Sequence, residues 1–384
     1  MNKKVAIVQN KINLGGRLDV IVHIVKYLND LDIIPHILTF SMNAITKEDI
    51  YKYYNLKIDY DLIEIKERIK LPHELNILYF NFILKRFEKR YDFFISSNNT
   101  SYLMPCIPVL SYVHFPRKYR LLSKYVSIHD RNKVKKGWLQ GKSGPYLKLT
   151  QQLYKFNKNI NSKNLIICNS EFSKQCFREV YHHYRDDISV IHPPVFIKLN
   201  KEYSIKEDSV VSIGRFSNTK GQLEQIKIAE RLQNVNFHIV GFTNKKENYY
   251  LKCYNYVKDN KVKNVFFHIN ASYEDKRDIL KRAKIFLHTT EDEPFGITIV
   301  EGIMNGCLPI VSDSGGQKEI VFLDRLRYTR IEEIREIIKE IIDNKINYEF
   351  NIKILQNHIK KYDRKSFLNK LDKIYGKFIS EYVR

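Results

Sequence analysis

Short apolar runs alternate with amphipathic stretches along nearly the whole chain, and they fall into two series. The first comprises residues 5–8, 34–40, 92–96, 108–113, 165–168 and 188–192; the second comprises 210–214, 237–241, 265–268, 285–288 and 308–312. Continuous apolar strands separated by helices are typical of parallel sheets covered on both faces. The pattern therefore predicts an α/β protein with two doubly wound parallel-sheet (Rossmann-like) domains.

A polar and charged stretch, Phe196–Glu207, separates the two series. We therefore expect one domain over residues 1–200 and a second over 201–365. The chain from Ile331 to Arg384 has only a helical pattern. Its last segment, 366–384, is predicted to be a helix that crosses back to the first domain.

The composition is that of a globular protein, with 43% hydrophobic and 28% charged residues among 384. It excludes intrinsic disorder over most of the chain. The five cysteines are far apart and form no CxxC pair, which argues against a disulfide framework or a zinc site and favours a reducing compartment. No signal peptide and no membrane-spanning apolar run is recognised, so the sequence predicts a soluble, cytosolic protein.

The formal net charge of +22 calls for an anionic partner. Such an excess attracts nucleic acid, anionic lipid or phosphorylated small molecules, and composition alone leaves these three open. Part of the charge is concentrated: residues 117–142 hold nine Lys and Arg, one acidic residue (Asp130) and the only tryptophan, Trp138.

Four junctions between a strand and the next helix carry unusual residues, and ligands of open parallel sheets bind at such junctions. At the first, Gly15 and Gly16 precede the first helix, where paired glycines let the backbone approach a phosphate closely. No GxGxxG or GKS/T motif is present, which disfavours a dinucleotide fold or a P-loop hydrolase. A tight turn without a ligand is the alternative.

At the second junction, Pro116 ends the strand and leaves His114 at its carboxyl end. A neutral imidazole there can donate a hydrogen bond or shuttle a proton. A structural histidine beside apolar neighbours is the alternative.

The third junction places two cations, Arg215 and Lys220, around the end of a strand that finishes at Gly214. Arginine offers a planar fork to phosphate oxygens and lysine a compact charge, so the pair suits a diphosphate. A solvated basic loop is the alternative.

The fourth junction contains Glu293, followed by Pro294 and Gly296 at the start of a helix, with Glu301 eight residues after Glu293. The backbone amides of residues 295–297 are expected to point free donors at an anion, supported by the helix dipole. The two carboxylates could accept hydrogen bonds from the hydroxyls of two sugars. Ordinary N-capping would explain an acidic first turn, but not Glu301 or the proline and glycine spacing.

With these residues in place, the chain resembles a retaining glycosyltransferase of family 4, of GT-B architecture. The matching positions are Glu293-Pro294-Phe295-Gly296 through Glu301 (the Glu-x7-Glu signature), Gly306, Ser314-Gly315-Gly316, Gly214-Arg215-Phe216, Lys220-Gly221, Asn169-Ser170, Phe172-Ser173 and Ile191-His192-Pro193-Pro194-Val195. His114-Phe115-Pro116 with Pro193-Pro194 is similar to mannosyltransferases that extend dolichol-linked oligosaccharides. The glycine pair departs from the pattern, because Arg17-Leu18 precede the acidic Asp19.

The resemblance implies two domains facing each other across a cleft, the first on the acceptor side and the second holding a nucleotide sugar. Arg215 and Lys220 would then bind the donor diphosphate. Glu293 would contact the transferred sugar, and Glu301 would contact the ribose.

It also implies roles for backbone groups and for the first domain. Phe295, Gly296 and Ile297 would contribute amides to the donor, Ile269-Asn270 would meet the base, and Gly15 and Gly16 would approach the phosphates. His114 would face the reacting sugar. We count His114, Glu293, Arg215 and Lys220 as the catalytic set.

The expected activity is transfer of a hexose, mannose favoured, from a GDP or UDP sugar to a glycan or lipid-linked glycan with retention. The donor is a substrate, and no cofactor or metal is expected, because the cations and helix amides could stabilise the leaving diphosphate and no DxD triplet is found. A glucan synthase, a nucleotide-sugar epimerase or a nucleic-acid-binding protein are the alternatives. Against the last, no zinc-finger, RRM-like or helix-turn-helix signature is found.

An apolar segment around Leu75–Leu84 is followed at once by Lys85, Arg86, Lys89 and Arg90. Basic residues beside aromatic anchors suit an anionic lipid surface, which predicts peripheral association with the cytosolic face of a membrane. A core helix with a solvated basic end is the alternative.

Overall fold

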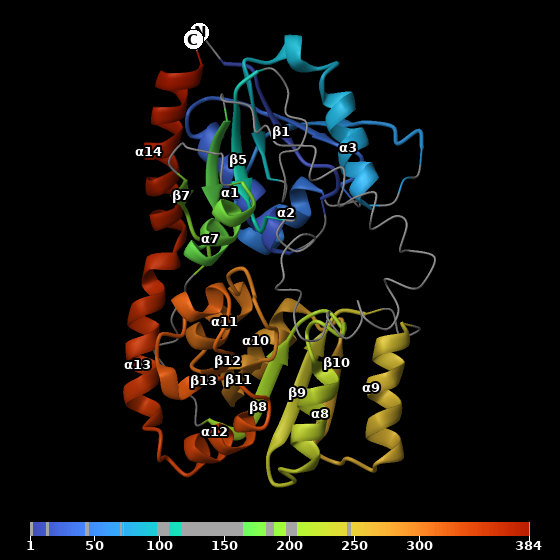
Figure 1. The fold of residues 1–384 in the computed structure, drawn as a ribbon, viewed down its shortest axis with the longest axis vertical. Coiled ribbons are helices and arrows are strands. Elements are labelled where there is room, and N and C mark those ends of the chain that lie inside the picture. Colours follow the sequence, from blue (N-terminus) through green and yellow to red (C-terminus); the bar gives the residue numbers. More distant parts are fainter. Residues whose placement is uncertain are drawn as a thin grey trace. The chain divides into compact units, whose positions relative to one another are not determined.

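A computed structural model describes residues 3–12, 15–42, 46–69, 71, 73–97, 107–116, 164–181, 188–196, 206–243 and 247–383. The basic stretch 117–142, with Trp138, lies outside these residues. By their internal contacts the residues divide into two compact units, one of Met1–Phe196 with Arg364–Arg384 and one of Ile197–Asp363. The final segment therefore groups with the first unit (Figure 1).

Unit 1 contains a seven-stranded sheet in the order β3-β2-β1-β4-β5-β6-β7, in which all pairs are parallel. Its elements are β1 (Val5–Val8), α1 (Gly16–Asn29), β2 (His36–Thr39), α2 (Lys47–Tyr54), β3 (Asp61–Glu64), α3 (His73–Leu84), β4 (Phe93–Ser96), β5 (Val109–Val113), β6 (Asn164–Cys168), α7 (Glu171–Val180), β7 (Ser189–Val190) and α14 (Arg364–Tyr382).

Unit 2 contains a six-stranded parallel sheet in the order β10-β9-β8-β11-β12-β13. Its elements are β8 (Glu207–Ile213), α8 (Gln222–Glu230), β9 (Asn236–Gly241), α9 (Asn248–Asp259), β10 (Val265–Ile269), α10 (Tyr273–Arg282), β11 (Ala283–His288), α11 (Ile297–Met304), β12 (Leu308–Ser312), β13 (Arg327–Tyr328), α12 (Glu333–Ile342) and α13 (Tyr348–Ile359). The predicted pair of doubly wound parallel sheets is confirmed.

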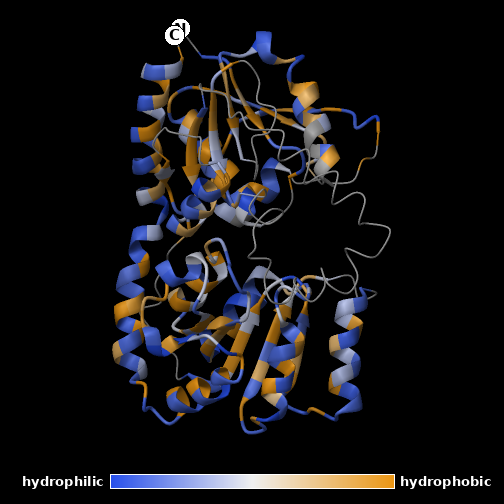
Figure 2. Ribbon diagram, viewed as in Figure 1, coloured by the Kyte–Doolittle hydropathy of each residue, from blue (hydrophilic) through white to orange (hydrophobic). Residues whose placement is uncertain are grey.

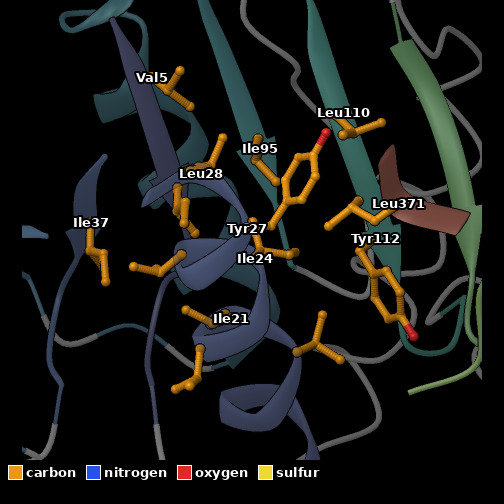
Figure 3. Close-up of a cluster of buried hydrophobic side chains, with 14 of the residues drawn as sticks. Val5, Ile21, Ile24, Tyr27, Leu28, Ile37, Ile95, Leu110, Tyr112 and Leu371 are labelled. Carbon is orange, nitrogen blue, oxygen red and sulfur yellow. The ribbon is translucent and has the colours of Figure 1, made fainter. Parts of the chain in front are cut away.

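Helix α14 shows why the last segment belongs to unit 1. Its buried side chains recur every three or four residues, which places them on one face (Phe367, Leu371, Tyr375 and Phe378). Apolar and polar positions alternate along the helix in Figure 2. They join the core formed by α1 and the sheet, where Leu371 lies beside Leu110 and Tyr112 (Figure 3). Each fully buried side chain of this size contributes about 2 kcal/mol.

Polar contacts fix the same helix against α1 and α2. The hydroxyl of Tyr27 donates to Asp372 at 2.8 Å, and the guanidinium of Arg364 donates to His23 Nε2 at 3.0 Å and to the carbonyl of Tyr54 at 3.1 Å. The docking of α14 therefore combines an apolar stripe with specific hydrogen bonds.

The sequence pattern misses two short strands, β3 and β13. Strand β3 lies at an edge of the sheet of unit 1, and its side chains are mostly exposed. Strand β13 lies at an edge of the sheet of unit 2 and has only two residues. Edge strands bury less of their surface, so they lack the continuous apolar run that marks a central strand.

Candidate active site

The strand order of unit 2 reverses between β8 and β11, which are neighbours although β9 and β10 intervene in the sequence. Loops that leave the two strands on either side of such a reversal run in opposite directions and open a crevice at their carboxyl ends, where ligands of open α/β sheets bind. The loop after β8 carries Arg215 and Lys220, and the loop after β11 carries Glu293.

The loop after β8 is anchored by one aromatic ring. Phe216 is buried against Tyr250 and Phe267, and a Cβ on Gly241 of β9 would lie only 2.4 Å from its ring. The side chain of Gln222 also donates to the carbonyl of Arg215 at 3.0 Å. The backbone is thereby fixed on both sides of Arg215.

Arg215 itself is exposed, and within the described residues its guanidinium has no hydrogen bond or ion pair. A fixed backbone with a free guanidinium suits binding of an anion from solution.

A buried polar network joins the two loops. The Ser212 hydroxyl donates to Gln225 Oε1 at 2.7 Å, and Gln225 Nε2 donates to Thr289 Oγ1 at 2.8 Å. The Thr289 hydroxyl in turn donates to the carbonyl of Lys220 at 2.7 Å. A fully satisfied network of this kind fixes the position of Lys220 relative to the end of β11.

The segment Ser314-Gly315-Gly316 supports Glu293 from the other side. The Ser314 hydroxyl accepts from the N–H of Asp292 at 2.9 Å, and the N–H of Gly316 donates to the carbonyl of Glu293 at 2.8 Å. A Cβ on Gly315 would lie 2.7 Å from both the nitrogen and the oxygen of Glu293. This close approach explains the glycine at position 315.

These loops bring Lys220, Glu293 and His288 together, which we call the Lys220 cluster. Lys220 Nζ donates to Glu293 Oε2 at 2.8 Å, and His288 Nε2 lies 3.4 Å from the same oxygen. Burial raises the pKa of Glu293, but the charge of Lys220 and the neighbouring His288 outweigh it and hold the pKa well below its usual range. Burial lowers the pKa of His288, which keeps this ring neutral.

Helix α11 begins beside the cluster. Gly296 is its N-cap, and the first helical hydrogen bonds are donated by Ile299 and Val300 to the carbonyl of Gly296. The N–H groups of Ile297 and Thr298 therefore precede the intrahelical bonding and suit an anion. The ring of Phe295 is buried against Tyr362, so only its backbone could serve in binding.

Glu301 lies one turn further along α11 and is paired with a residue that sequence reasoning missed. Lys276 of α10 donates to both carboxylate oxygens of Glu301, at 3.1 and 3.2 Å. No sequence signal identifies Lys276, because the two residues lie on different helices and meet only in the fold.

Ile269 is the last residue of β10 and Asn270 follows it, at the strand end that was expected, but the Asn270 side chain has a structural role. Asn270 adopts a left-handed backbone conformation. Its side-chain amide accepts a hydrogen bond from the backbone N–H of Thr243 and donates one to the carbonyl of Thr243, both at 3.2 Å. Contact with a base remains a prediction for the backbone of this turn.

In unit 1, His114 lies directly after β5. Its Nε2 shares a hydrogen bond of 2.9 Å with the hydroxyl of Ser97, which follows β4. Burial, with a smaller contribution from the guanidinium of Arg17, lowers the pKa of His114 to about 3. The ring is therefore neutral at physiological pH, so it can donate or accept a hydrogen bond but carries no charge.

The glycine pair of unit 1 starts α1. Gly15 precedes the helix, its carbonyl accepts from Leu18 at 2.8 Å, and a Cβ on it would meet nothing within 4 Å. Gly16 is the first helical residue. The structure thus leaves open space beside the loop, and the contact with phosphates stays a prediction.

The described part of the chain holds neither a cluster of metal-ligating side chains nor a helix suited to cross a membrane. No three His, Cys, Asp or Glu side chains among the described residues gather as they would around a metal ion. None of the described helices is both long and apolar enough to cross a bilayer.

Comparison with known families places the site within a described domain. Residues 197–366 match the model of the family described as glycosyl transferases group 1. This stretch covers the whole of unit 2, including the Lys220 cluster and Glu301. Unit 2 is therefore a glycosyl transferases group 1 domain.

One related protein is the GDP-Man:Man(3)GlcNAc(2)-PP-Dol alpha-1,2-mannosyltransferase of Dictyostelium discoideum, which is 23% identical over 248 residues. The match covers 57% of this chain and 48% of that protein. The chain thus spans about half the length of this relative.

Solved structures confirm the fold over nearly the whole chain. Anabaena HepE in complex with UDP and glucose has a TM-score of 0.69 at 14% identity, covering 98% of this chain and 100% of that one. The sucrose-phosphate synthase of Thermosynechococcus elongatus has a TM-score of 0.72 at 12% identity, covering 99% and 100%. The fold is GT-B, as the sequence predicts.

Proposed function

We propose that the protein is a retaining, metal-independent glycosyltransferase that moves a hexose, mannose favoured, from a nucleoside diphosphate sugar to a glycan or lipid-linked glycan. The observation that carries this proposal is the Lys220 cluster at the strand reversal of unit 2, together with Arg215 in the same loop as Lys220 and the first amides of α11. Mannose is favoured because the Dictyostelium relative is named for transfer from GDP-mannose.

The chemistry requires stabilisation of a diphosphate as its bond to the anomeric carbon breaks. Arg215 and Lys220 supply two positive charges, and the N–H groups of Ile297 and Thr298 supply oriented dipoles, so the residues themselves can neutralise the leaving group. Fixed donors of this kind cost no reorganisation during the reaction. The proposal therefore needs no divalent ion.

The two glutamates fit hydroxyl groups of a sugar and of a ribose. Glu293 is held as an anion that accepts hydrogen bonds, which suits hydroxyls of the transferred sugar. Glu301 is oriented by Lys276 and presents carboxylate oxygens to vicinal hydroxyls. We assign no covalent role to Glu293, since a route in which the donor phosphate deprotonates the acceptor uses the same residues.

A panel of nucleotide sugars tests the proposal. GDP-mannose, UDP-glucose, UDP-galactose and UDP-N-acetylglucosamine are screened for thermal stabilisation and for hydrolysis of the donor. We expect one of them to raise the melting temperature by several degrees and to be hydrolysed slowly with release of the α anomer, which proton NMR detects. If none binds or is hydrolysed, the proposed activity is wrong.

We further propose that the protein associates peripherally with the cytosolic face of a membrane, where a lipid-linked acceptor would lie. The apolar segment of α3 is largely core, since Phe80, Ile83 and Leu84 are buried. Phe82, however, is 56% exposed and lines a groove of about 350 Å³.

The groove is strongly basic. Its charged lining residues are all cations (Lys66, Arg68, Arg86 and Arg90), and within the described residues none of them has an ion pair. Unpaired cations beside an exposed aromatic ring suit an anionic lipid surface.

Sedimentation with vesicles of phosphatidylglycerol and phosphatidylcholine tests this association. The triple variant Arg68→Ser, Arg86→Ser, Arg90→Ser should lose most of its binding. A control with the same loss of charge on the exposed side of α14 (Lys370→Ser, Lys373→Ser, Lys377→Ser) should keep it. Equal binding by the two variants would show that only the net charge acts.

A further inference from the structure

His288 combines burial with an unused hydrogen-bonding atom. It is the last residue of β11, only 3% exposed, and its Nε2 is one of the buried side-chain atoms that find no hydrogen-bond partner. Leaving such an atom unpaired costs about 1–3 kcal/mol, and native structures rarely do so. The atom lies 3.4 Å from Glu293 Oε2, which is too far for a good hydrogen bond.

His288 Nε2 and Lys220 Nζ compete for the same oxygen, Glu293 Oε2. Glu293 Oε2 already accepts from Lys220 Nζ at 2.8 Å. Lys220 is also the residue that would bind the donor diphosphate, and an ammonium that turns to two phosphate charges leaves its carboxylate. Glu293, whose side chain is only 19% exposed, would then keep a charge without a partner.

We propose that His288 is a positioning residue that takes over Glu293 when Lys220 turns to the diphosphate. In the free protein the ion pair with Lys220 holds the carboxylate; with donor bound, His288 Nε2–H closes on Oε2 and holds it instead. Glu293 then stays aimed at the sugar and stays an acceptor throughout. The inference rests on the proposed function.

The electrostatics of the cluster agree with this exchange. Burial lowers the pKa of His288, the charge of Lys220 lowers it further, and the charge of Glu293 opposes both. A neutral ring carries one N–H, so it can donate to the carboxylate without adding a second positive charge beside Lys220.

The exchange also matters for the protonation of Glu293. Burial raises the pKa of this carboxyl, and the contributions of Lys220 and His288 oppose that rise. Once Lys220 has left, only the histidine does so. Without it the carboxyl would protonate more readily, and a protonated oxygen would donate rather than accept.

Two substitutions separate this role from simple packing. His288→Gln keeps an N–H near the position of Nε2, whereas His288→Phe fills the space without a donor. We expect His288→Phe to retain its fold and its affinity for GDP or UDP within about threefold, but to lower kcat at least tenfold. Its acid limb of kcat against pH should also move to higher pH, and His288→Gln should recover most of both effects.

A direct measurement follows the hydrogen bond itself. In nitrogen-15 spectra of histidine-labelled protein, the His288 signal is assigned by its loss in His288→Gln. Addition of GDP or UDP, or of inorganic pyrophosphate, should shift this imidazole signal as the bond to Glu293 forms. Lys220→Met should show the shifted signal without any ligand.

The outcomes distinguish the inference from the proposed function. If the wild-type protein hydrolyses a nucleotide sugar but His288→Phe matches it in kcat and in pH profile, His288 is only structural. An imidazole signal that does not respond to the diphosphate would overturn the exchange as well. If the wild type binds and hydrolyses no nucleotide sugar, the proposed function fails, and the exchange fails with it.

Discussion

The carboxyl ends of the two sheets differ in how their polar residues are held. In unit 2 the loops after the central strands β8 and β11 carry the ion pair of Lys220 with Glu293, and Lys276 of α10 pairs with Glu301 of α11. In unit 1 the residues that directly follow the central strands β4 and β5, Ser97 and His114, are neutral and share a hydrogen bond. Two doubly wound sheets of the same kind thus present different chemistry at the same edge.

The difference indicates that the two units suit different chemical groups. A diphosphate needs cations that are fixed before it arrives, and unit 2 fixes them through buried networks and close glycine contacts. The neutral pair of Ser97 and His114 in unit 1 suits hydroxyl groups, which need hydrogen bonds but no charge.

The largest effect should come from removing charge at unit 2. Glu293→Gln should lower kcat for donor hydrolysis 100- to 1,000-fold, as is typical when one preorganised electrostatic group is lost. His114→Gln should lower it only about tenfold, because a neutral hydrogen bond is replaced by another. Steady-state kinetics of both variants measure the two losses of kcat. Equal losses would show that the charge in unit 2 matters no more than the neutral hydrogen bond in unit 1.

The next effect concerns two glycines that share one backbone conformation. Gly315 (φ 71°, ψ −171°) and Gly15 (φ 127°, ψ −175°) both lie in a region that only glycine adopts easily. Alanine should strain both, but at Gly315 its Cβ would also meet the backbone of Glu293. Gly315→Ala should therefore lose about 2 kcal/mol more stability than Gly15→Ala.

Urea unfolding followed by hydrogen exchange in each sheet measures this difference unit by unit. A loss at Gly15→Ala as large as at Gly315→Ala would show that backbone strain alone acts. In that case the close contact with the backbone of Glu293 would not add to the loss of stability in Gly315→Ala.

Acid should weaken unit 1 through His114. Its pKa is about 3 in the folded protein against a usual 6.5, so the unfolded chain binds the proton first. The stability it contributes is complete above pH 6.5 and is lost as the pH falls from there towards 3. Between pH 7 and pH 5 the loss should be about 2 kcal/mol.

The variant His114→Gln should lack this part of the pH dependence. Hydrogen exchange of β4 and β5 at pH 7 and pH 5 compares it with the wild type. If the two proteins lose the same stability on acidification, His114 is not held neutral by the fold.

The smallest effect should come from Lys276→Met. Glu301 would lose the cation that orients it, yet keep its own place on α11. We expect the dissociation constant of the bound nucleoside diphosphate to rise about fivefold, or about 1 kcal/mol, measured by calorimetry. An unchanged constant would mean that Glu301 does not depend on Lys276.

Local patterns predict much of the fold and part of the site. Central strands such as β8 and β11 are buried on both faces, so their apolar runs can be recognised in the sequence. The loops that directly follow these strands can then be located as well. The edge strands β3 and β13 bury too little to leave such a run.

Contacts between distant residues could not be predicted in the same way. Lys220 and Glu293 are 73 residues apart, and the sequence does not show that they pair rather than both facing a ligand. The same is true of Lys276 beside Glu301 and of Asn270 bracketing Thr243. These partners depend on which strands become neighbours in the sheet, and local periodicity does not predict the strand order.

Lys220 is the residue on which the proposed binding of a diphosphate depends most. Calorimetry with GDP and GMP, and with UDP and UMP, measures whether the protein prefers the diphosphate, with Lys220→Met and Lys220→Met/Glu293→Gln as variants and circular dichroism as the control for folding. We predict that the wild type prefers a diphosphate by about 30-fold, as one or two charge-assisted hydrogen bonds provide, and that both variants lose this preference. If Lys220→Met binds the diphosphate as tightly and as selectively as the wild type, the central claim is wrong.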